Sequence, residues 1–307
     1  ISRGLVGSEM CIRDSVCIVG AGYTGLSTAL HLSRLGYSVA VLEAHRVGFG
    51  ASGRNGGQLG AGQRVSQDEL VSYLGEKHAH NLWLLAKDAV NTVKEIIKTN
   101  KIDCHLKPGV ATLGFNSKEV KGLHQYAEYL EKKYNYDGLE KLDHKVCSAI
   151  CGSEKYKGGI LDMNAAHLHP LRFVFGLAKA AIQAGADIFE KSEVRSLLPG
   201  KVNRTLTNSG EIQSEFVVLG CNGYLGNLEQ KVAAKVMPIN NFIVATEPLG
   251  DRAESVLAKD IAVADTKFVV NYFRLSDDKR LLFGGGENYS YKFPSNITST
   301  VLKPMLE

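Results

Sequence analysis

Hydrophobic residues in the first part of the chain follow the pattern of a strand, a helix and a second strand. An apolar run begins at Val16, helical spacing recurs from Leu26 to Ser33, and a second apolar run leads to Glu43. The turn after the first strand reads Gly-Ala-Gly-Tyr-Thr-Gly, whose glycines allow a tight turn, close approach of a pyrophosphate and close helix packing. The pattern therefore predicts a dinucleotide-binding βαβ unit.

The chemistry of this unit selects the kind of dinucleotide. An anion is stabilised at the N-terminus of the predicted helix by free N–H groups and the helix dipole, without a basic side chain. Glu43 at the end of the second strand suits the two hydroxyls of an adenosine ribose and would repel a 2′-phosphate, so NADP is disfavoured. Candidate cofactor-binding residues in this unit are Gly20, Gly22, Tyr23, Thr24, Gly25 and Glu43.

The remaining pattern alternates between helical and strand periods. Helical spacing predicts helices over residues 68–100, 118–133 and 170–185. Alternating or continuous apolar residues predict two short strands in 104–115, a β-meander in 194–219, and further strands within 241–250, 265–276 and 279–289. Residues 46–64 contain seven glycines and cannot supply a core, so we expect a loop that lines a cofactor.

These elements predict an α/β protein. We expect a Rossmann-type FAD-binding domain with a β-meander, formed by residues 16–75 and 150–230, and an α+β substrate domain with an antiparallel sheet, formed by 76–149 and 231–307. A meander that returns to such a sheet is unusual in simple NAD dehydrogenases. Residues 1–15 lack any strand or helix period and are expected to be foreign or disordered, and the whole chain is expected to be a fragment.

Composition excludes several classes of protein. The chain has 307 residues, 44% hydrophobic and 22% charged, and its net charge of +4 comes from scattered residues, so a nucleic-acid partner is not expected. We expect no membrane span and a cytoplasmic location, because long apolar runs and a secretory signal are absent from the sequence. The six cysteines lack zinc-ligand spacing, so reduced thiols and no metal are expected.

Six sequence words, in order along the chain, carry a resemblance to a known family. They are VGAGYTGLSTALHL, VGFGASGRNGGQ, HLHPL, VVLGCNGYLGNL, ATEPLGD and YFRLSDDKRLLFGGG. Together they resemble the D-amino-acid-oxidase-like family of FAD-dependent amine oxidoreductases. The resemblance implies that the cofactor is FAD and that a further C-terminal segment of the family, which closes the flavin site, is missing here.

The resemblance also implies roles for particular residues. The glycine-rich loop would lie near the flavin, Val194 would contact the adenine through its backbone, and the turn after the returning strand would approach the cofactor. The loop residues are Ser52, Gly53, Arg54, Asn55, Gly56, Gly57 and Gln58, and those of the turn are Gly220 and Asn222.

The implied reaction is oxidative deamination of a small-molecule amine, such as gamma-glutamylputrescine or a similar diamine derivative, with molecular oxygen as electron acceptor. A substrate carboxylate would suit an arginine, and Arg274 is the first candidate, with Tyr272 on the same strand face. The alternative for Arg274 is a surface ion pair, for example with Asp277. His167 and His169 could transfer protons, although at least one of them is expected to cap a helix or fill a hydrogen-bonding position.

Three other functions stay open at this point. The chain could be another amino-acid or secondary-amine oxidase or dehydrogenase of the same family. It could be an NAD-linked dehydrogenase, although the glycine-rich loop and the meander argue against that reading. It could also be a non-catalytic flavin-binding subunit. Oligomeric state is not predicted by any feature of the sequence.

Overall fold

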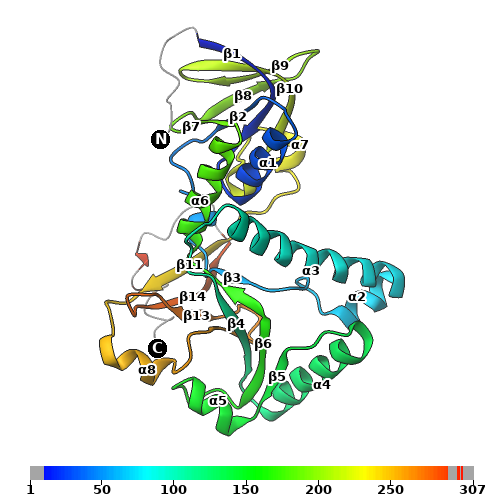
Figure 1. The fold of residues 1–307 in the computed structure, drawn as a ribbon, viewed down its shortest axis with the longest axis vertical. Coiled ribbons are helices and arrows are strands. Elements are labelled where there is room, and N and C mark those ends of the chain that lie inside the picture. The colour runs from blue at the N-terminus through cyan, green and yellow to red at the C-terminus, as the bar shows by residue number, and fades with distance from the viewer. Residues whose placement is uncertain (1–9, 290–295, 298, 300–307) are drawn as a thin grey trace.

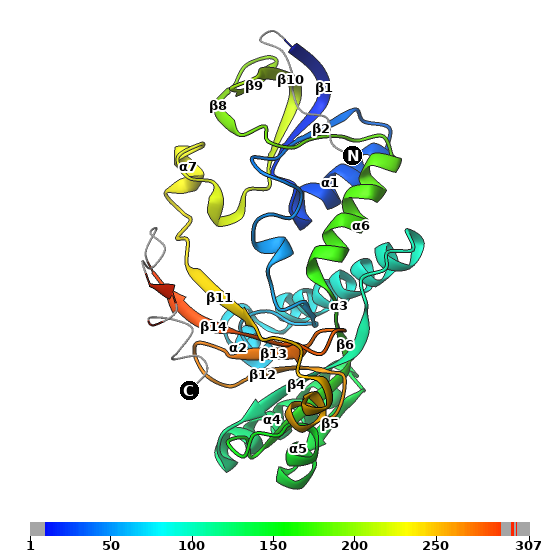
Figure 2. The same cartoon turned by 90° about the vertical axis from the view of Figure 1, so that its left-hand side faces the viewer.

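The computed structural model describes residues 10–289 together with 296, 297 and 299, and it contains two sheets. Figure 1 shows one sheet at the top of the molecule and the other at the bottom, with α6 and the end of α3 between them. Figure 2, turned by 90°, shows the same separation and the segment near residue 50 descending from the upper half to the lower.

The first sheet has six strands in the order β7-β2-β1-β10-β9-β8. Its strands are β1 (Met10–Val19), β2 (Val39–Leu42), β7 (Asp187–Phe189), β8 (Val194–Leu198), β9 (Asn203–Thr207) and β10 (Gly210–Leu219). β1 pairs in parallel with both β2 and β10, and β8, β9 and β10 form an antiparallel meander. The predicted Rossmann-type sheet with a meander is confirmed.

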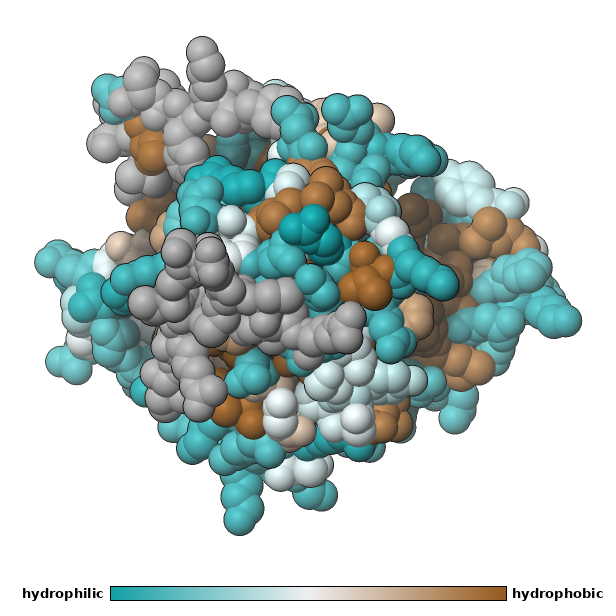
Figure 3. Space-filling view, turned by 90° about the horizontal axis from the view of Figure 1, so that it is seen from above, coloured by the Kyte–Doolittle hydropathy of each residue, from teal (hydrophilic) through white to brown (hydrophobic). Residues whose placement is uncertain are grey.

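Both faces of this sheet carry buried apolar side chains. Helices α1 (Tyr23–Arg34) and α6 (Pro170–Gln183) cover one face, where Val16 and Ile18 are buried with Leu26 and Leu30. Cys17 points to the other face, under the meander, as strand alternation requires. Two short elements follow β10, namely η2 (Asn222–Tyr224) and α7 (Gln230–Ala233). The space-filling view from above shows hydrophobic residues as separate patches among hydrophilic ones on this end (Figure 3).

The second sheet has the strand order β11-β14-β13-β12-β4-β6-β3, with β5 paired to β6. Its strands are β3 (Gln58–Leu59), β4 (Lys107–Gly114), β5 (Leu139–Leu142), β6 (Gly158–His167), β11 (Asn240–Ala245), β12 (Ala262–Asp265), β13 (Tyr272–Leu275) and β14 (Leu281–Asn288). The predicted antiparallel arrangement is found for every pair except β12 and β4, which are parallel.

Helices surround the second sheet. They are α2 (Gln67–Leu74), α3 (Glu76–Thr99), α4 (Ser117–Tyr134), α5 (His144–Ile150) and α8 (Ala253–Val256). The short turn η3 (Gly250–Arg252) leads directly into α8, and η1 (Ala51–Gly53) lies in the glycine-rich loop. One face of the sheet forms a core with α5 and α8 that includes Leu113, Leu161, Val263 and Phe273. None of the helices in residues 10–289 is long and apolar enough to span a membrane.

Three predicted elements differ in detail. The helix predicted over 68–100 is divided at Gly75, whose φ of 78° ends α2 and precedes α3. The two strands predicted in 104–115 are one strand, β4, with a bulge at Gly109. The strand predicted over 265–276 is a hairpin, because the Asp265 side chain accepts hydrogen bonds from the N–H groups of Lys267 and Asn271 and turns the chain.

The predicted domain boundaries also differ from the sheets. β3 and β6 belong to the second sheet, so the segments 58–75 and 150–167 lie outside the first one. β1 begins at Met10 and pairs with β10 from that residue, so the expectation of disorder is wrong for residues 10–15. Residues 1–9, and residues 290–295, 298 and 300–307 of the predicted substrate domain, lie outside the described residues.

Candidate active site

A cavity of about 500 Å³ lies at the carboxyl ends of β1, β2 and β10 and is called the Gly20 cavity here. Glu193 and Val194 close one end, and the segment after β10 closes the other. Its lining residues are 19–22, 42–45, 48–52, 193, 194, 220–222, 224, 225 and 228. Seven of the predicted cofactor-binding residues therefore lie together here: Gly20, Gly22, Glu43, Ser52, Val194, Gly220 and Asn222.

The turn before α1 has the geometry that its glycines predict. Gly20 has a φ of 104°, a conformation that residues with a Cβ rarely adopt. A Cβ on Gly25 would lie 1.9 Å from the carbonyl oxygen of Gly20, so only glycine permits this approach of helix to strand. Gly22 is the N-cap residue of α1 and has no side chain with which to cap it. The N-terminus of α1 is therefore available to an anion in the Gly20 cavity.

Glu43 holds the turn to the end of β2. Its Oε2 accepts a hydrogen bond of 2.8 Å from the N–H of Ala21, and its Oε1 accepts one of 2.9 Å from the N–H of His45. A carboxylate has about four lone-pair directions, so two stay available for ribose hydroxyls. Glu43 thus stabilises the turn in addition to its predicted contact with the ribose.

The glycine-rich loop is held by its own polar side chains. Ser52 Oγ accepts a hydrogen bond of 3.0 Å from the N–H of Tyr23. The Asn55 amide donates to the carbonyl oxygens of Ala51 and Ser52, and its Oδ1 accepts from the N–H of Gly57. Asn55 therefore fixes the shape of the loop.

A second cavity, of about 420 Å³, begins at the next residue of the loop and is called the Arg274 cavity here. Ser52 lines the Gly20 cavity, and Gly53 and Arg54 line this one, so consecutive residues of the loop border the two cavities. Side chains from β11, β13 and β14 form the opposite wall. The lining residues are 53–55, 105, 107, 167, 169, 170, 243, 260, 274–278, 280 and 282.

Arg274 and Tyr272 both contact the loop at Gly56. Arg274 Nε donates a hydrogen bond of 2.8 Å to the carbonyl oxygen of Gly56, and a Cβ on Gly56 would lie 2.6 Å from the Tyr272 ring. The Tyr272 hydroxyl donates to Asn241 Oδ1 on β11 at 2.7 Å. The predicted common face of Tyr272 and Arg274 is present, and it is the face that meets the loop.

Arg274 is buried, with 6% of its surface exposed. The alternative of a surface ion pair with Asp277 is therefore wrong, and within the described residues Arg274 forms no ion pair at all. Burial lowers the pKa of Arg274 from its ordinary value, and the nearby Asp260 opposes that change. A buried guanidinium without a carboxylate partner favours an anionic ligand in this cavity.

The two histidines have different environments. His169 is the N-cap of α6, where its Nδ1 accepts from the N–H of Arg172, so the expectation that one histidine caps a helix is confirmed. His167 is 2% exposed, its Nε2 lies 3.2 Å from the carbonyl oxygen of Asp260, and its Nδ1 is buried without a hydrogen-bond partner among the described residues. Burial lowers the pKa of both side chains and so favours their neutral forms.

A group of charged residues at the edge of the Arg274 cavity was not predicted. Lys107 Nζ contacts the carboxylates of Asp260 and Asp277, and Asp277 also contacts His105. The parallel pairing of β4 and β12 brings Lys107 beside Asp260, although more than 150 residues separate them in sequence. No local motif could have revealed this pairing.

Five of the predicted cofactor residues line a third cavity, of about 400 Å³, between α1, α3 and α6. They are Tyr23, Thr24, Asn55, Gly57 and Gln58, and Asn55 also lines the Arg274 cavity. Gln58 lies in β3 and donates to the carbonyl oxygen of Val263 at 2.9 Å, which anchors the loop to the second sheet. The structure therefore assigns Gln58 a structural contact, and its predicted role at the cofactor stays a prediction.

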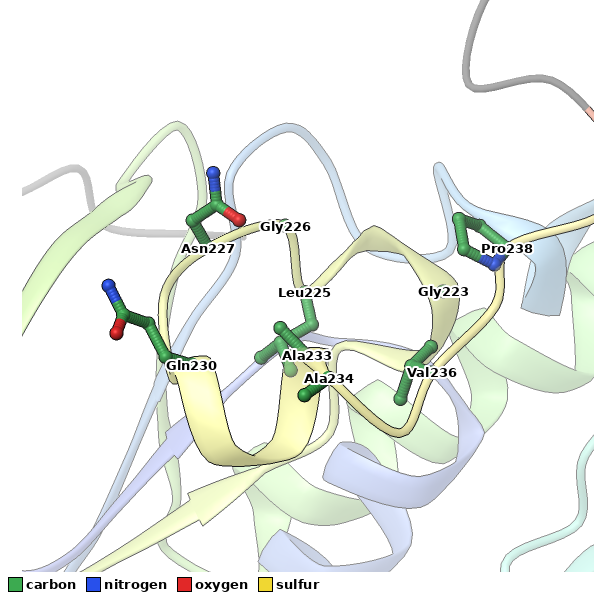
Figure 4. Close-up of a pocket in the computed structure, with 9 residues that line it drawn as sticks. All are labelled: Gly223, Leu225, Gly226, Asn227, Gln230, Ala233, Ala234, Val236 and Pro238. Carbon is green, nitrogen blue, oxygen red and sulfur yellow. The ribbon is translucent and has the colours of Figure 1, made fainter.

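A further cavity, of about 670 Å³, lies between η2 and α7 (Figure 4). Its lining contains Leu225, Val236 and Pro238 with small and amide residues, and none of its lining residues is ionisable. The chemistry of the site therefore belongs to the Gly20 and Arg274 cavities. Within the described residues, no three His, Cys, Asp or Glu side chains gather in a way that could hold a metal ion.

Comparison with known proteins places this geometry in a family. A family profile described as FAD dependent oxidoreductase matches residues 15–307. The chain belongs to this family of FAD dependent oxidoreductases. The predicted family, its enzymatic class and the cofactor FAD are thereby confirmed.

Two curated relatives and one solved structure are similar to this chain. A probable oxidoreductase OrdL of Rhizobium meliloti is 39% identical over 96% of this chain and 69% of its own length. The gamma-glutamylputrescine oxidoreductase of Escherichia coli is 36% identical over 96% of this chain and 70% of its own length. Glycine oxidase of Geobacillus kaustophilus has the same fold, with a TM-score of 0.73 at 19% identity over 95% of this chain and 77% of its own. The chain thus spans about two thirds of the length of these curated relatives.

The residues present fit FAD. The Gly20 cavity offers the N-terminus of α1 for the pyrophosphate and the Glu43 carboxylate for the ribose, and the Arg274 cavity is lined by the next residues of the loop. With FAD bound, residues of the Gly20 cavity would hold its ADP half, and the loop beyond Ser52 would lie toward its ring. Bound FAD would supply the electron-accepting ring for the reaction.

Proposed function

We propose that the protein oxidises a small amine that also carries a carboxylate, with gamma-glutamylputrescine or a similar diamine derivative as the preferred substrate. The observation that supports this proposal is the buried Arg274, whose guanidinium has no carboxylate partner among the described residues and borders the cavity beside the glycine-rich loop. The relative in Escherichia coli, 36% identical, is named for gamma-glutamylputrescine.

The proposed reaction balances as follows. The unprotonated amine R–CH₂–NH₂ loses a hydride from carbon to FAD and a proton from nitrogen, which leaves the imine R–CH=NH. Water hydrolyses the imine to an aldehyde and ammonia, and molecular oxygen takes two electrons and two protons from reduced FAD to give hydrogen peroxide. Oxygen as electron acceptor and a cytoplasmic location belong to this proposal and rest on the sequence alone.

In this proposal the chain orients the substrate rather than attacking it. Arg274 binds the carboxylate of the substrate, and Tyr272 packs against the loop at Gly56 beside it. Burial lowers the pKa of His167 and His169 and favours their neutral forms, and with 2% of its surface exposed His167 has little access to solvent for proton exchange. Proton transfer by His167, which the sequence suggested, is therefore not part of the proposal.

A second substrate class is favoured by one specific contact. Arg274 donates to the carbonyl oxygen of Gly56, so its guanidinium lies directly against the loop proposed to hold the flavin. A carboxylate bound there would be close to the reacting carbon, as it is in an α-amino acid. Oxidation of an amino acid is therefore the competing activity.

A flavin-reduction screen separates these functions. Anaerobic protein loaded with FAD is mixed with gamma-glutamylputrescine, putrescine, sarcosine, glycine and D-amino acids, and loss of the visible flavin absorbance is followed. We expect fastest reduction by gamma-glutamylputrescine, and at least tenfold slower reduction by putrescine, because it lacks the carboxylate. Faster reduction by an α-amino acid would support the competing activity, and reduction by none of them would favour a non-catalytic flavin-binding subunit.

The arginine is tested in the same assay. Arg274→Gln removes the charge, and Arg274→Lys keeps it without the fork that binds two oxygens. Both changes should raise KM for gamma-glutamylputrescine more than for putrescine. Equal effects on the two substrates would remove Arg274 from the carboxylate site.

A further inference from the structure

The buried guanidinium of Arg274 keeps donor groups that no described residue uses. Its Nε donates to the carbonyl oxygen of Gly56, and its Nη1 donates to that of Leu275 at 3.3 Å. Its Nη2 donates to no group within residues 10–289. A guanidinium has five N–H donors in a planar fork, so Arg274 can still bind a carboxylate in the Arg274 cavity.

Three carboxylates of the described residues also line the Arg274 cavity, and two of them use both of their oxygens. Asp277 contacts Lys107 through Oδ1 and His105 through Oδ2. Both oxygens of Asp278 accept hydrogen bonds from side chains of its own hairpin turn, at 2.6 Å and 2.7 Å. Neither of these two carboxylates therefore keeps an oxygen without a partner.

Asp260 is the third carboxylate, and it keeps one oxygen unused. Its Oδ2 contacts Lys107, but its Oδ1 accepts no hydrogen bond from the part of the chain that the structure describes. His167 Nε2 lies 3.8 Å from this Oδ1 and is closer, at 3.2 Å, to the carbonyl oxygen of Asp260. The Asp260 side chain is 47% exposed, so a ligand can reach Oδ1 from the cavity.

Arg274 and Asp260 interact without neutralising each other. Burial lowers the pKa of Arg274, and the charge of Asp260 acts against that change. Among the described residues, however, the two side chains are not in ion-pair contact. The cavity thus offers an unpaired cation and, in its electrostatic range, a carboxylate with a free oxygen. This combination suits a ligand that carries a negative and a positive group on the same carbon.

We propose that Arg274 and Asp260 form a headgroup site, in which Arg274 binds the α-carboxylate of the substrate and Asp260 Oδ1 binds its α-ammonium. This inference rests on the proposed function, because gamma-glutamylputrescine carries such an amino-acid headgroup at the end opposite its reacting amine. Lys107 holds Asp260 through Oδ2 and leaves Oδ1 to the ligand.

The charge of Asp260 separates two classes of substrate. The amine that is oxidised must be unprotonated when the hydride leaves the neighbouring carbon. A carboxylate beside an ammonium favours the protonated form. In an α-amino acid held at the headgroup site, the reacting amine would therefore stay protonated. A diamine derivative has a second amine that is free to react, so the headgroup site selects this class.

Binding of two unreactive amides to FAD-loaded protein, measured by calorimetry, tests the headgroup site. L-gamma-glutamylbutylamide has the headgroup but no terminal amine, and glutaric acid monobutylamide is the same molecule without the α-ammonium. We expect the first to bind about tenfold more tightly, which is the low end for a hydrogen bond between charged groups, because Asp260 is half exposed. Equal dissociation constants would overturn the proposal, and this comparison needs no variant.

The carboxylate is then tested by a pair of matched variants. Asp260→Asn should remove most of the preference for the headgroup and leave the binding of the monobutylamide as it was. Asp277→Asn is the control, because Asp277 also lines the cavity and contacts Lys107 but has no unused oxygen. It should keep the preference. Equal losses in both variants would assign the preference to the net charge of the cavity or to a released Lys107, and the proposal would be wrong.

Flavin absorbance in the same samples separates this inference from the proposed substrate. Bleaching by L-gamma-glutamylbutylamide would overturn the headgroup site, because the α-amine would then be the reacting group. If the amides show the preference but gamma-glutamylputrescine does not reduce the flavin, the headgroup site is supported and the proposed substrate is wrong. If gamma-glutamylputrescine reduces the flavin and the two amides bind equally, only the headgroup site is wrong.

Discussion

Replacement of Gly56 by alanine tests how the glycine-rich loop is joined to the second sheet. A Cβ at this position would lie 2.6 Å and 2.7 Å from two carbons of the Tyr272 ring. Favourable carbon contacts occur at about 3.5 to 4.0 Å, so the ring or the loop must move by roughly 1 Å. Gly56 does not have a positive φ, so alanine meets this steric conflict without additional backbone strain.

The ring cannot move freely. Its hydroxyl is hydrogen-bonded to Asn241 at 2.7 Å, and on its other side it packs against Gly284. Overpacking in a well-packed site costs about 1 to 3 kcal/mol, and loss of a hydrogen bond costs about 0.5 to 1.5 kcal/mol. We therefore expect Gly56→Ala to reduce the free energy of unfolding by about 2 to 3 kcal/mol.

A double-mutant cycle isolates this conflict. The free energy of unfolding is measured by urea denaturation for wild type, Gly56→Ala, Tyr272→Ala and the double mutant. The cost of Gly56→Ala should fall below about 1 kcal/mol when the Tyr272 ring is absent, which gives a coupling of about 1 to 2 kcal/mol. Gly60→Ala is the control, because its Cβ would lie 3.8 Å from that of Ala165, an ordinary contact. A Gly56→Ala cost that is the same in both backgrounds would refute the steric argument.

Three further changes test other parts of the site and fold. Glu43→Gln should weaken FAD binding by about 1 to 3 kcal/mol in a flavin titration, because an amide cannot replace both acceptor oxygens of the carboxylate; unchanged affinity would exclude the ribose contact. Asn116→Ala should destabilise the protein by about 1 kcal/mol in urea, because Asn116 Oδ1 accepts from two N–H groups at the start of α4, and no loss would show that water replaces the cap. Burial lowers the pKa of His167 in the folded protein, so the unfolded chain takes up a proton on this side chain at a higher pH than the folded chain does. The free energy of unfolding should therefore fall as the pH drops through about 6.5. His167→Gln should make that fall shallower, and an unaltered pH profile would contradict the assignment.

The first sheet could be predicted because its signals are local. The strand that ends at Gly20, the helix after it and the acid at Glu43 lie within one continuous segment, and the turn residues of the meander lie directly between their strands. Each of these signals reflects a steric or chemical requirement at a single position. At Gly25, for example, a Cβ would lie only 1.9 Å from the carbonyl oxygen of Gly20. Periodicity and turn chemistry were therefore sufficient for this part of the fold.

For the second sheet, the sequence predicted that strands would pair in an antiparallel sheet but not which strands belong to it. β3 and β6 were placed in the wrong domain because their pairing partners are far away in sequence, and apolar alternation carries no information about which sheet a strand joins. The contacts of Lys107 with Asp260, and of Arg274 with Gly56, arise from such pairings. Arg274 was singled out from its strand, but its burial depends on a loop more than 200 residues earlier.

We propose that the loop from Gly53 to Gln58 couples recognition of the cofactor to recognition of the substrate. On the side of the first sheet, the Asn55 amide ties it to the turn at Ala51 and Ser52. On the side of the second sheet, Tyr272 and Arg274 contact it at Gly56. The carbonyl group of Gly56 belongs to the loop and accepts the hydrogen bond from Arg274. A ligand that orders the loop should therefore also position Arg274, the arginine proposed to bind the substrate. Saturation with FAD should consequently tighten binding of a carboxylate inhibitor in wild type, and this coupling should be lost in Arg274→Gln because the variant has neither the contact with Gly56 nor the charge.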